Sequence, residues 1–182
     1  FFTDRQQVYK VRAADFADGK ASLLGDYLPT KLGMDEEEKV IELVLPGDYS
    51  GHVLFFFENG KCARVSLSAY ATTSNRRKLT GAYSDKSPLA ALVPLTEDRE
   101  LALISTEPRA LLLHTALLAP KTTRSTQGVA VMNMKPRYHL DRVCTPEESG
   151  ITNLARYRVR SIPAAGALLR EEDQGREQMS LL

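Results

Sequence analysis

The stretch FFFENGKCARV, residues 55–65, decides the fold of this 182-residue chain. An apolar run at its start and a mixed run at its end flank the polar pair Asn59-Gly60. Asn-Gly between two strand-like runs is a strong short-range signal for a β-hairpin, because glycine adopts the positive backbone angles that a tight turn needs. The stretch therefore predicts two antiparallel strands joined at Gly60.

The hairpin pattern occurs three times along the chain. FFTDRQQVYKV, residues 1–11, aligns with it without gaps 54 positions earlier, and LISTEPRALLL, residues 103–113, aligns 48 positions later, with Pro108 where Gly60 stands. Self-similarity at a period of this size is typical of repeat architectures. The chain is therefore predicted to be built from three copies of one supersecondary unit.

Each predicted hairpin is followed by a polar stretch that ends in glycine and then by a further apolar stretch. The polar stretches are KASLLG (20–25), RRKLTG (76–81) and TRSTQG (123–128), and the apolar ones are 40–45, 89–95 and 138–143. Four short strands in about 48–54 residues match a propeller-type blade. We expect an all-β domain over residues 1–165 with about three to four blades (about 1–50, 51–100 and 101–160), and a flexible C-terminal tail over 166–182.

Composition places the chain among ordinary globular proteins. The apolar fraction is 43% and the charged fraction 26%, so no metal or disulfide is needed to hold a core. Cys62 and Cys144 make no disulfide framework, which favours a reducing compartment. No apolar run approaches the length of a membrane span, and no signal peptide is seen. A strand-like start at Phe1 predicts a piece of a longer protein.

Positive charge is concentrated in the middle of the chain. The 24 basic and 23 acidic residues nearly cancel overall, but residues 51–145 carry 13 basic and 7 acidic groups. If the units are arranged around an axis, equivalent basic loops fall on one rim and form a curved positive stripe that fits DNA phosphates. The residues predicted to bind DNA are Arg76, Arg77, Lys78, Lys86, Lys121, Arg124, Lys135 and Arg137.

Two other interpretations stay open. In the first, the arginines in these loops cap loop carbonyls, and the chain is a propeller-like scaffold for protein interactions that does not bind DNA. The second, a catalytic interpretation, has little support, because His52, His114 and His139 are far apart and no nucleophile or phosphate-loop motif is present. No catalytic residue, metal ligand or cofactor is predicted in this chain.

The repeat resembles the C-terminal domain of the A subunit of bacterial type IIA topoisomerases, DNA gyrase and topoisomerase IV. The resemblance rests on FFFENGK (55–61), Arg64-Val65 and the basic stretch that ends at Gly81, with their counterparts in the other units, and it covers about residues 1–165. It implies a β-pinwheel, a propeller variant whose neighbouring blades exchange strands. It also implies a cytoplasmic, nucleoid-associated domain that binds and bends or wraps duplex DNA along its rim.

The resemblance further implies a longer parent that breaks and rejoins DNA, with a B subunit that supplies ATP hydrolysis and magnesium. No residue here matches the parent's reactive tyrosine. Where gyrase carries a Gln-Arg-Arg-Gly-Gly-Lys-Gly type box, this chain has NRRKLTG (75–81), so both supercoiling and relaxation or decatenation stay open. The terminal QMSLL resembles a peptide that docks on the bacterial sliding clamp, which predicts a second partner for Gln178, Met179, Ser180, Leu181 and Leu182.

Overall fold

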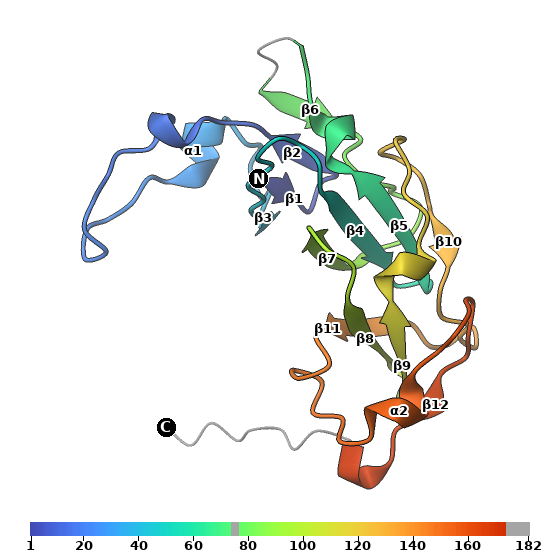
Figure 1. Ribbon diagram of the computed structural model, residues 1–182. Coiled ribbons are helices and arrows are strands. Elements are labelled where there is room, and N and C mark those ends of the chain that lie inside the picture. Colours follow the sequence, from blue (N-terminus) through green and yellow to red (C-terminus); the bar gives the residue numbers. More distant parts are fainter. Residues whose placement is uncertain (74–76, 174–182) are drawn as a thin grey trace.

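The computed structural model describes residues 1–73 and 77–173, which form three four-stranded antiparallel sheets. We refer to the sheets as blade 1, blade 2 and blade 3 in chain order. Figure 1 shows them following one another along an arc, with β3, β7 and β11 toward its inner side and β6, β10 and β12 on its convex side. The all-β architecture of repeated four-stranded blades predicted from the sequence is confirmed.

Within each blade, the strands follow one another from the inner to the outer edge of the arc. Blade 1 contains, in this spatial order, β3 (Val40–Glu42), β1 (Phe2–Thr3), β2 (Gln7–Tyr9) and β6 (Lys78–Thr80). Blade 2 contains β7 (Leu89–Leu95), β4 (His52–Phe57), β5 (Lys61–Ser66) and β10 (Val129–Ala130). Blade 3 contains β11 (Leu140–Cys144), β8 (Glu100–Ser105), β9 (Arg109–His114) and β12 (Ala167–Leu168). The two α-helices of the described residues are single turns, α1 (Leu28–Leu32) and α2 (Leu154–Tyr157).

The central hairpins have the register that the gap-free alignment requires. Phe2 pairs with Val8 in blade 1, Phe56 with Cys62 in blade 2, and Ile104 with Ala110 in blade 3. Gly60 has φ +78° at the turn of blade 2, and its equivalent Gln6 takes φ +53°, an angle that costs a side-chain-bearing residue more than it costs glycine. The repeat predicted from the sequence is therefore a repeat of backbone geometry.

The outer strand of blade 1 and that of blade 2 come from the following unit. Strand β6 pairs with β2, with Leu79 opposite Val8, and β10 pairs with β5, with Val129 opposite Cys62. This exchange confirms the β-pinwheel arrangement. It also shows that Gly81 and Gly128, which end equivalent polar stretches in the sequence, are not equivalent in the structure. Gly81 follows the outer strand β6, whereas Gly128 precedes β10 and occupies the position that Lys78 has in blade 1. Outer strands of two or three residues carry too little apolar pattern to fix this register from sequence.

The hydrophobic core lies between the blades. In β4, Phe55 and Phe57 face blade 1, whereas Leu54 and Phe56 face blade 3, and all four are at most 2% exposed. Because side chains alternate between the two faces of a strand, a continuous apolar run is what a strand buried on both faces requires. Burial of this kind holds the blades together.

A segment after β11 closes the far face of blade 3. The Tyr157 hydroxyl donates a hydrogen bond of 2.6 Å to Asp173 Oδ2, and the other oxygen of Asp173 accepts from the backbone N–H and hydroxyl of Thr152. Asp173 is 1% exposed, and these hydrogen bonds lower its pKa to about 2. Together with β12, the contacts extend the domain beyond the boundary expected at residue 165, and the described part of the predicted tail, 166–173, packs on blade 3.

Candidate nucleic-acid interface

In each blade, the chain segment that contains the outer strand runs beside the second strand of the central hairpin. We call residues 77–80, 120–130 and 158–168 the outer-edge segments of blades 1, 2 and 3. Lys10 N–H donates to Arg77 O at 2.7 Å, Lys121 N–H to Arg64 O at 2.8 Å, and Val159 N–H to Leu112 O at 3.1 Å. The backbone of each blade therefore places one such segment along the convex side of the arc (Figure 1).

In blade 1, the outer-edge segment carries Arg77 and Lys78. Arg77 is exposed, while Lys78 is half-buried with its ammonium 3.4 Å from Asp35 Oδ2 and 5.4 Å from the centre of the Tyr9 ring. The Tyr9 hydroxyl and the Asp35 carboxylate raise the pKa of Lys78, so this side chain keeps its charge at neutral pH. The third predicted residue of this loop, Arg76, lies outside the described residues.

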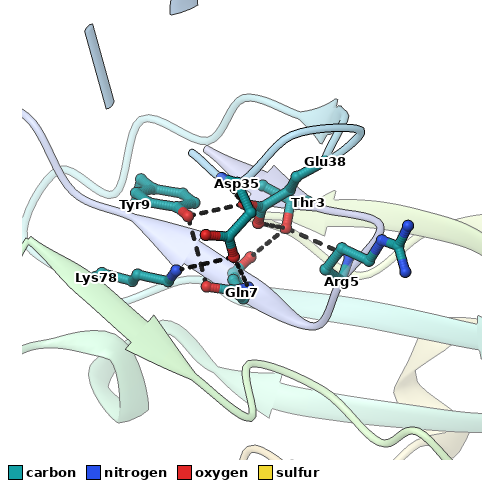
Figure 2. Close-up of polar contacts among 7 residues, drawn as sticks. All are labelled: Thr3, Arg5, Gln7, Tyr9, Asp35, Glu38 and Lys78. Atoms are coloured by element: carbon teal, nitrogen blue, oxygen red, sulfur yellow. Dashed lines mark hydrogen bonds and ion pairs between the residues drawn. The ribbon is translucent and has the colours of Figure 1, made fainter. Parts of the chain in front are cut away.

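Figure 2 shows what holds the partner of Lys78 in place. Residues 35–38, DEEE, form an acidic segment in the first unit, which is six residues longer than the second, 54 against 48. Glu38 is 5% exposed and accepts hydrogen bonds from the Thr3 hydroxyl at 2.5 Å and the Tyr9 hydroxyl at 2.8 Å. The acidic segment is thus fixed on the central hairpin of blade 1, beside its outer edge.

The outer-edge segment of blade 2 carries Lys121 and Arg124, which differ in their surroundings. Lys121 is exposed, and its backbone forms two hydrogen bonds with β5 of blade 2. Its N–H donates to Arg64 O, and its carbonyl accepts from Ser66 N–H. The Arg124 guanidinium instead donates to Ala69 O at 3.2 Å and lies 6.0 Å from the centre of the Tyr70 ring. Arg124 therefore contributes to local structure as well as to surface charge.

The other three predicted residues lie at the opposite end of the blades, near the hairpin turns. Lys86 precedes Pro88, whose carbonyl accepts from Glu58 N–H, and Lys135 and Arg137 precede His139, whose carbonyl accepts from Thr106 N–H. Lys135 is paired with Glu107 at 2.6 Å and lowers the pKa of that carboxyl, and Lys86 lies 3.6 Å from Asp85. The exposed Arg137 guanidinium covers the Tyr138 ring at 4.8 Å.

The described residues contain no cluster of potential metal ligands. Among them, no three His, Cys, Asp or Glu side chains are grouped so that they could hold a metal ion. The half-buried Arg64 is a structural cation, because it pairs with Asp98 at 2.8 Å and donates to Thr115 O at 3.1 Å. Within the same part of the chain, every helix is too short to cross a membrane.

Comparison with curated proteins gives two relatives in sequence, while no family model matches the chain. The A subunit of DNA gyrase from Mycoplasma pneumoniae is 26% identical over 135 residues, which is 74% of this chain. The same subunit of Mycoplasma genitalium is 23% identical over 134 residues, or 72% of this chain. The chain spans 16% of the length of either relative.

Solved structures agree with this similarity. The crystal structure of the C-terminal domain of DNA topoisomerase IV superposes with a TM-score of 0.66 and 21% identity, covering 78% of this chain and 45% of that one. The fold is that of the gyrase A and topoisomerase IV C-terminal domains. The gyrase A C-terminal domain matches 94% of this chain and 61% of its own length (TM-score 0.60, 14% identity), and the E. coli ParC C-terminal domain matches 96% and 77% (TM-score 0.66, 14% identity). The resemblance predicted from the sequence is confirmed.

Within this gyrase A-type fold, blade 3 has an outer-edge segment that the sequence did not identify as basic surface. Arg160 is exposed and makes no ion pair with a described residue, whereas Arg158 forms two hydrogen bonds, of 2.5 and 2.8 Å, with the carboxylate of Glu100. The alternating sequence YRVR at 157–160 is typical of a strand and was the available signal, although the structure forms only a single β-bridge there, between Arg158 and Leu112. The position of this segment beside β9 would have marked Arg160 as a candidate.

Proposed function

We propose that the chain is the C-terminal DNA-binding part of the A subunit of a type II topoisomerase. In this proposal it binds duplex DNA without sequence preference along its outer-edge segments and bends or guides the duplex for strand passage. The similarity in sequence to the DNA gyrase A subunit supports the assignment, and the fold agrees with it.

The observation that carries the proposal is the recurrence of exposed cations on one side of the arc. Arg77, Lys121 and Arg160 are exposed and come from three different blades at the same edge. None of the three forms an ion pair with a residue in the described part of the chain, so their charge is available to a ligand. Phosphate contacts need charge at suitable spacing and carry no base code, which fits a row of separate cations along a curved edge.

Lys86, Lys135 and Arg137 extend the proposed surface to the turn end of the blades. Lys86 and Lys135 already have carboxylate partners, at 3.6 and 2.6 Å, so DNA would have to compete for them. Arg137 lies over the Tyr138 ring, forms no ion pair with a described residue and is the stronger candidate of the three. We therefore infer a main line of contacts at the outer-edge segments and a weaker one at the turn end.

The wider assignment also belongs to the proposal. A parent A subunit in the bacterial cytoplasm, associated with the nucleoid, would carry the DNA-cleaving tyrosine, and a B subunit would supply ATP hydrolysis and magnesium. Whether that parent supercoils DNA, as gyrase does, or relaxes and decatenates it depends on chiral wrapping. The predicted sliding-clamp peptide, 178–182, lies outside the described residues.

DNA affinity of the full 182-residue chain, measured over a range of salt concentrations, tests the proposal. The variant Arg77→Ala/Lys121→Ala should weaken binding of unrelated duplexes alike and reduce the slope of log affinity against log salt by about two, since each lost phosphate contact removes about 0.9. The matched control is Lys39→Ala/Arg142→Ala, which removes two exposed cations in or beside the inner-edge strands. An equal loss in both variants would contradict a defined outer-edge site.

Sealing nicked circular DNA in the presence of the chain separates the modes of binding. A change in linking number that grows with protein concentration indicates chiral wrapping and a gyrase-like parent. Binding without such a change indicates bending or tethering, as a relaxing or decatenating parent would need. No DNA binding at low salt would favour the protein-interaction scaffold instead.

A further inference from the structure

Two chain segments link blades 2 and 3 at the end of the blades away from the hairpin turns, and both contact Arg64. The first, residues 96–99, leads from β7 of blade 2 to β8 of blade 3, and the second begins at Thr115 and returns from β9 to the outer strand of blade 2. The Arg64 guanidinium forms an ion pair of 2.8 Å with Asp98 in the first segment. It also donates hydrogen bonds to the carbonyls of Thr115 and Leu118 in the second, at 3.1 and 3.4 Å. One cation therefore joins these two links.

The charge of Arg64 is committed inside the domain. Its side chain is 11% exposed, one terminal nitrogen lies 3.3 Å from His52 Nδ1, and its Nε has no hydrogen-bond partner within the described part of the chain. The Thr115 hydroxyl and the Arg64 guanidinium lower the pKa of Asp98, so this carboxylate stays ionised at neutral pH. Burial of a guanidinium is costly unless it is paired, so these contacts, and not contact with DNA, account for Arg64.

The second link leads directly into the outer-edge segment of blade 2. Leu118 is three residues before the exposed Lys121, and the ring of the intervening Pro120 fixes one backbone angle of the connection. The Lys121 N–H donates to the carbonyl of Arg64 itself at 2.8 Å. Arg64 thus holds the start of this segment both with its side chain and with its backbone.

Blade 1 repeats the arrangement with a lysine. Lys10 is equivalent to Arg64 in the gap-free alignment, 54 positions earlier. Its ammonium donates to Tyr70 O at 3.3 Å, and Tyr70 is equivalent to Leu118, 48 positions earlier. Its backbone N–H donates to Arg77 O at 2.7 Å, at the start of the outer-edge segment of blade 1. In two blades, the same position of the hairpin therefore carries a cation that holds the returning segment.

We propose that Arg64 and Lys10 are positioning residues for DNA binding. Each holds the returning segment so that the exposed cation that follows it, Lys121 in blade 2 and Arg77 in blade 1, is presented to a phosphate. A segment that is fixed before binding loses less conformational entropy when DNA binds, so its cation contributes more to affinity. The inference rests on the proposed function and adds to it the residues that hold the exposed cations in place.

Amide hydrogen exchange of the full chain without DNA tests the positioning role. Arg64→Met keeps the length of the side chain and removes its charge, so exchange at the Lys121 N–H should become about 5- to 10-fold faster. Exchange at the Lys10 N–H, which reports the outer-edge segment of blade 1, should stay unchanged. Arg64→Lys should restore most of the protection, because lysine makes the equivalent contact in blade 1. Unchanged exchange at Lys121 would overturn the inference.

Two further variants separate a local effect from general destabilisation. Asp98→Asn removes the ion pair but leaves Arg64 charged and bonded to its two carbonyls, so exchange at the Lys121 N–H should rise by less than in Arg64→Met. Lys10→Met is the matched control in blade 1, where it should speed exchange at the amide of residue 10 and leave Lys121 protected. Faster exchange at both amides in each variant would contradict a local role.

DNA binding then distinguishes positioning from direct contact. Arg64→Met should lower the slope of log affinity against log salt by about one, the value for a single phosphate contact, although Arg64 itself is not available to DNA. Adding Lys121→Ala should lower the slope no further, whereas adding Arg77→Ala should lower it by about one more. Lys10→Met should show the reverse pattern. Additive losses from Arg64→Met and Lys121→Ala would overturn the inference, since Arg64 would then act independently of Lys121.

The two measurements distinguish failure of this inference from failure of the proposed function. Unchanged amide exchange at Lys121 in Arg64→Met contradicts the inference at any DNA affinity. Faster exchange in Arg64→Met, together with unchanged DNA binding by Lys121→Ala, contradicts the outer-edge DNA site itself and leaves Arg64 with a structural role alone.

Discussion

The Lys78 ammonium on the outer strand of blade 1 forms an ion pair of 3.4 Å with the Asp35 carboxylate, which the acidic segment holds in place. Buried Glu38 fixes that segment by accepting hydrogen bonds from Thr3 and Tyr9. A carboxylate is thus positioned where the proposed function requires a phosphate. Blade 1 carries its own counter-ion at the edge proposed to face DNA, and phosphate must displace it.

Removing this counter-ion should strengthen DNA binding. The change Asp35→Ala leaves Lys78 free for phosphate, and because exposed ion pairs are weak we expect an affinity gain of about 2- to 5-fold at low salt. Electrophoretic retardation or anisotropy titration of one duplex measures the gain. Glu36→Ala is the control, since it removes the same charge from an exposed neighbour without an ion pair to a described residue; equal gains in both variants would attribute the effect to net charge alone.

Arg160→Ala should lower DNA affinity without lowering stability. Its side chain is exposed and forms no ion pair with a described residue, so its removal should affect the binding of a ligand and not the packing of the domain. The salt slope should fall by about one, as for a single phosphate contact. Arg158→Ala provides the comparison, because loss of its pair with Glu100 should change thermal stability as well. Unchanged DNA binding by Arg160→Ala would show that the outer-edge segment of blade 3 is not part of the interface.

Gly128→Ala and Gly81→Ala should differ sharply in their effect on unfolding. Gly128 has φ +72°, and a Cβ atom there would lie 1.9 Å from Cys62 O, so the exchanged strand β10 must shift; we expect a loss of roughly 3 kcal/mol or more. Gly81 has φ +61° with open space around it, so only backbone strain of about 1–2 kcal/mol is expected. Denaturant unfolding of both variants measures the difference, and similar losses would show that β10 is not tightly paired.

The closure of blade 3 should depend on the ionisation of Asp173. Its pKa is lowered to about 2 from 3.8, chiefly by the Tyr157 hydroxyl, so folding is favoured by the ionised form. That contribution is fully present above the unfolded pKa and is lost as the pH falls from about 4 toward 2. The stability difference between the parent chain and Asp173→Asn should therefore be largest near neutral pH and shrink on acidification.

Two variants check this account of blade 3. Tyr157→Phe should reproduce much of the loss of stability caused by Asp173→Asn. The double variant should lose less stability than the sum of the two single losses, because both changes affect the same hydrogen bond. Glu172→Gln alters an exposed neighbour and should show no such coupling to Tyr157. Additive losses at every pH would mean that the hydrogen bond does not close the blade.

The central hairpins could be predicted from the sequence because each carries a strong local signal. The run before Gly60 is apolar on both faces, and eleven residues align without gaps in all three units, so the register of Phe56 with Cys62 recurs in the other blades. The stretch 89–95 likewise coincides with β7, and the stretches 40–45 and 138–143 overlap β3 and β11. Patterns that span six or more residues therefore located their strands, although not always their ends.

The outer edge was harder to predict because its strands are short and their partners lie in another unit. Nothing within TRSTQG (123–128) shows that Gly128 occupies the position of Lys78, since only the register against β5 decides this. The partners of Lys135 and Arg124 were likewise invisible, because they depend on loops brought together by folding. Arg160 was missed for the same reason. Side-chain availability is a tertiary property, and the composition of a loop does not reveal it.

Strand exchange has a consequence for how such proteins gain and lose blades. The strands of blade 2 extend from residue 52 to residue 130, and the outer strand of blade 1 lies inside that span at 78–80. No single cut in the chain between these strands leaves both sheets whole. A duplication or deletion of one complete unit preserves every pairing, because each unit supplies the strand that its predecessor lacks. Gene rearrangements that change the number of blades should therefore survive only when they keep the phase of the repeat.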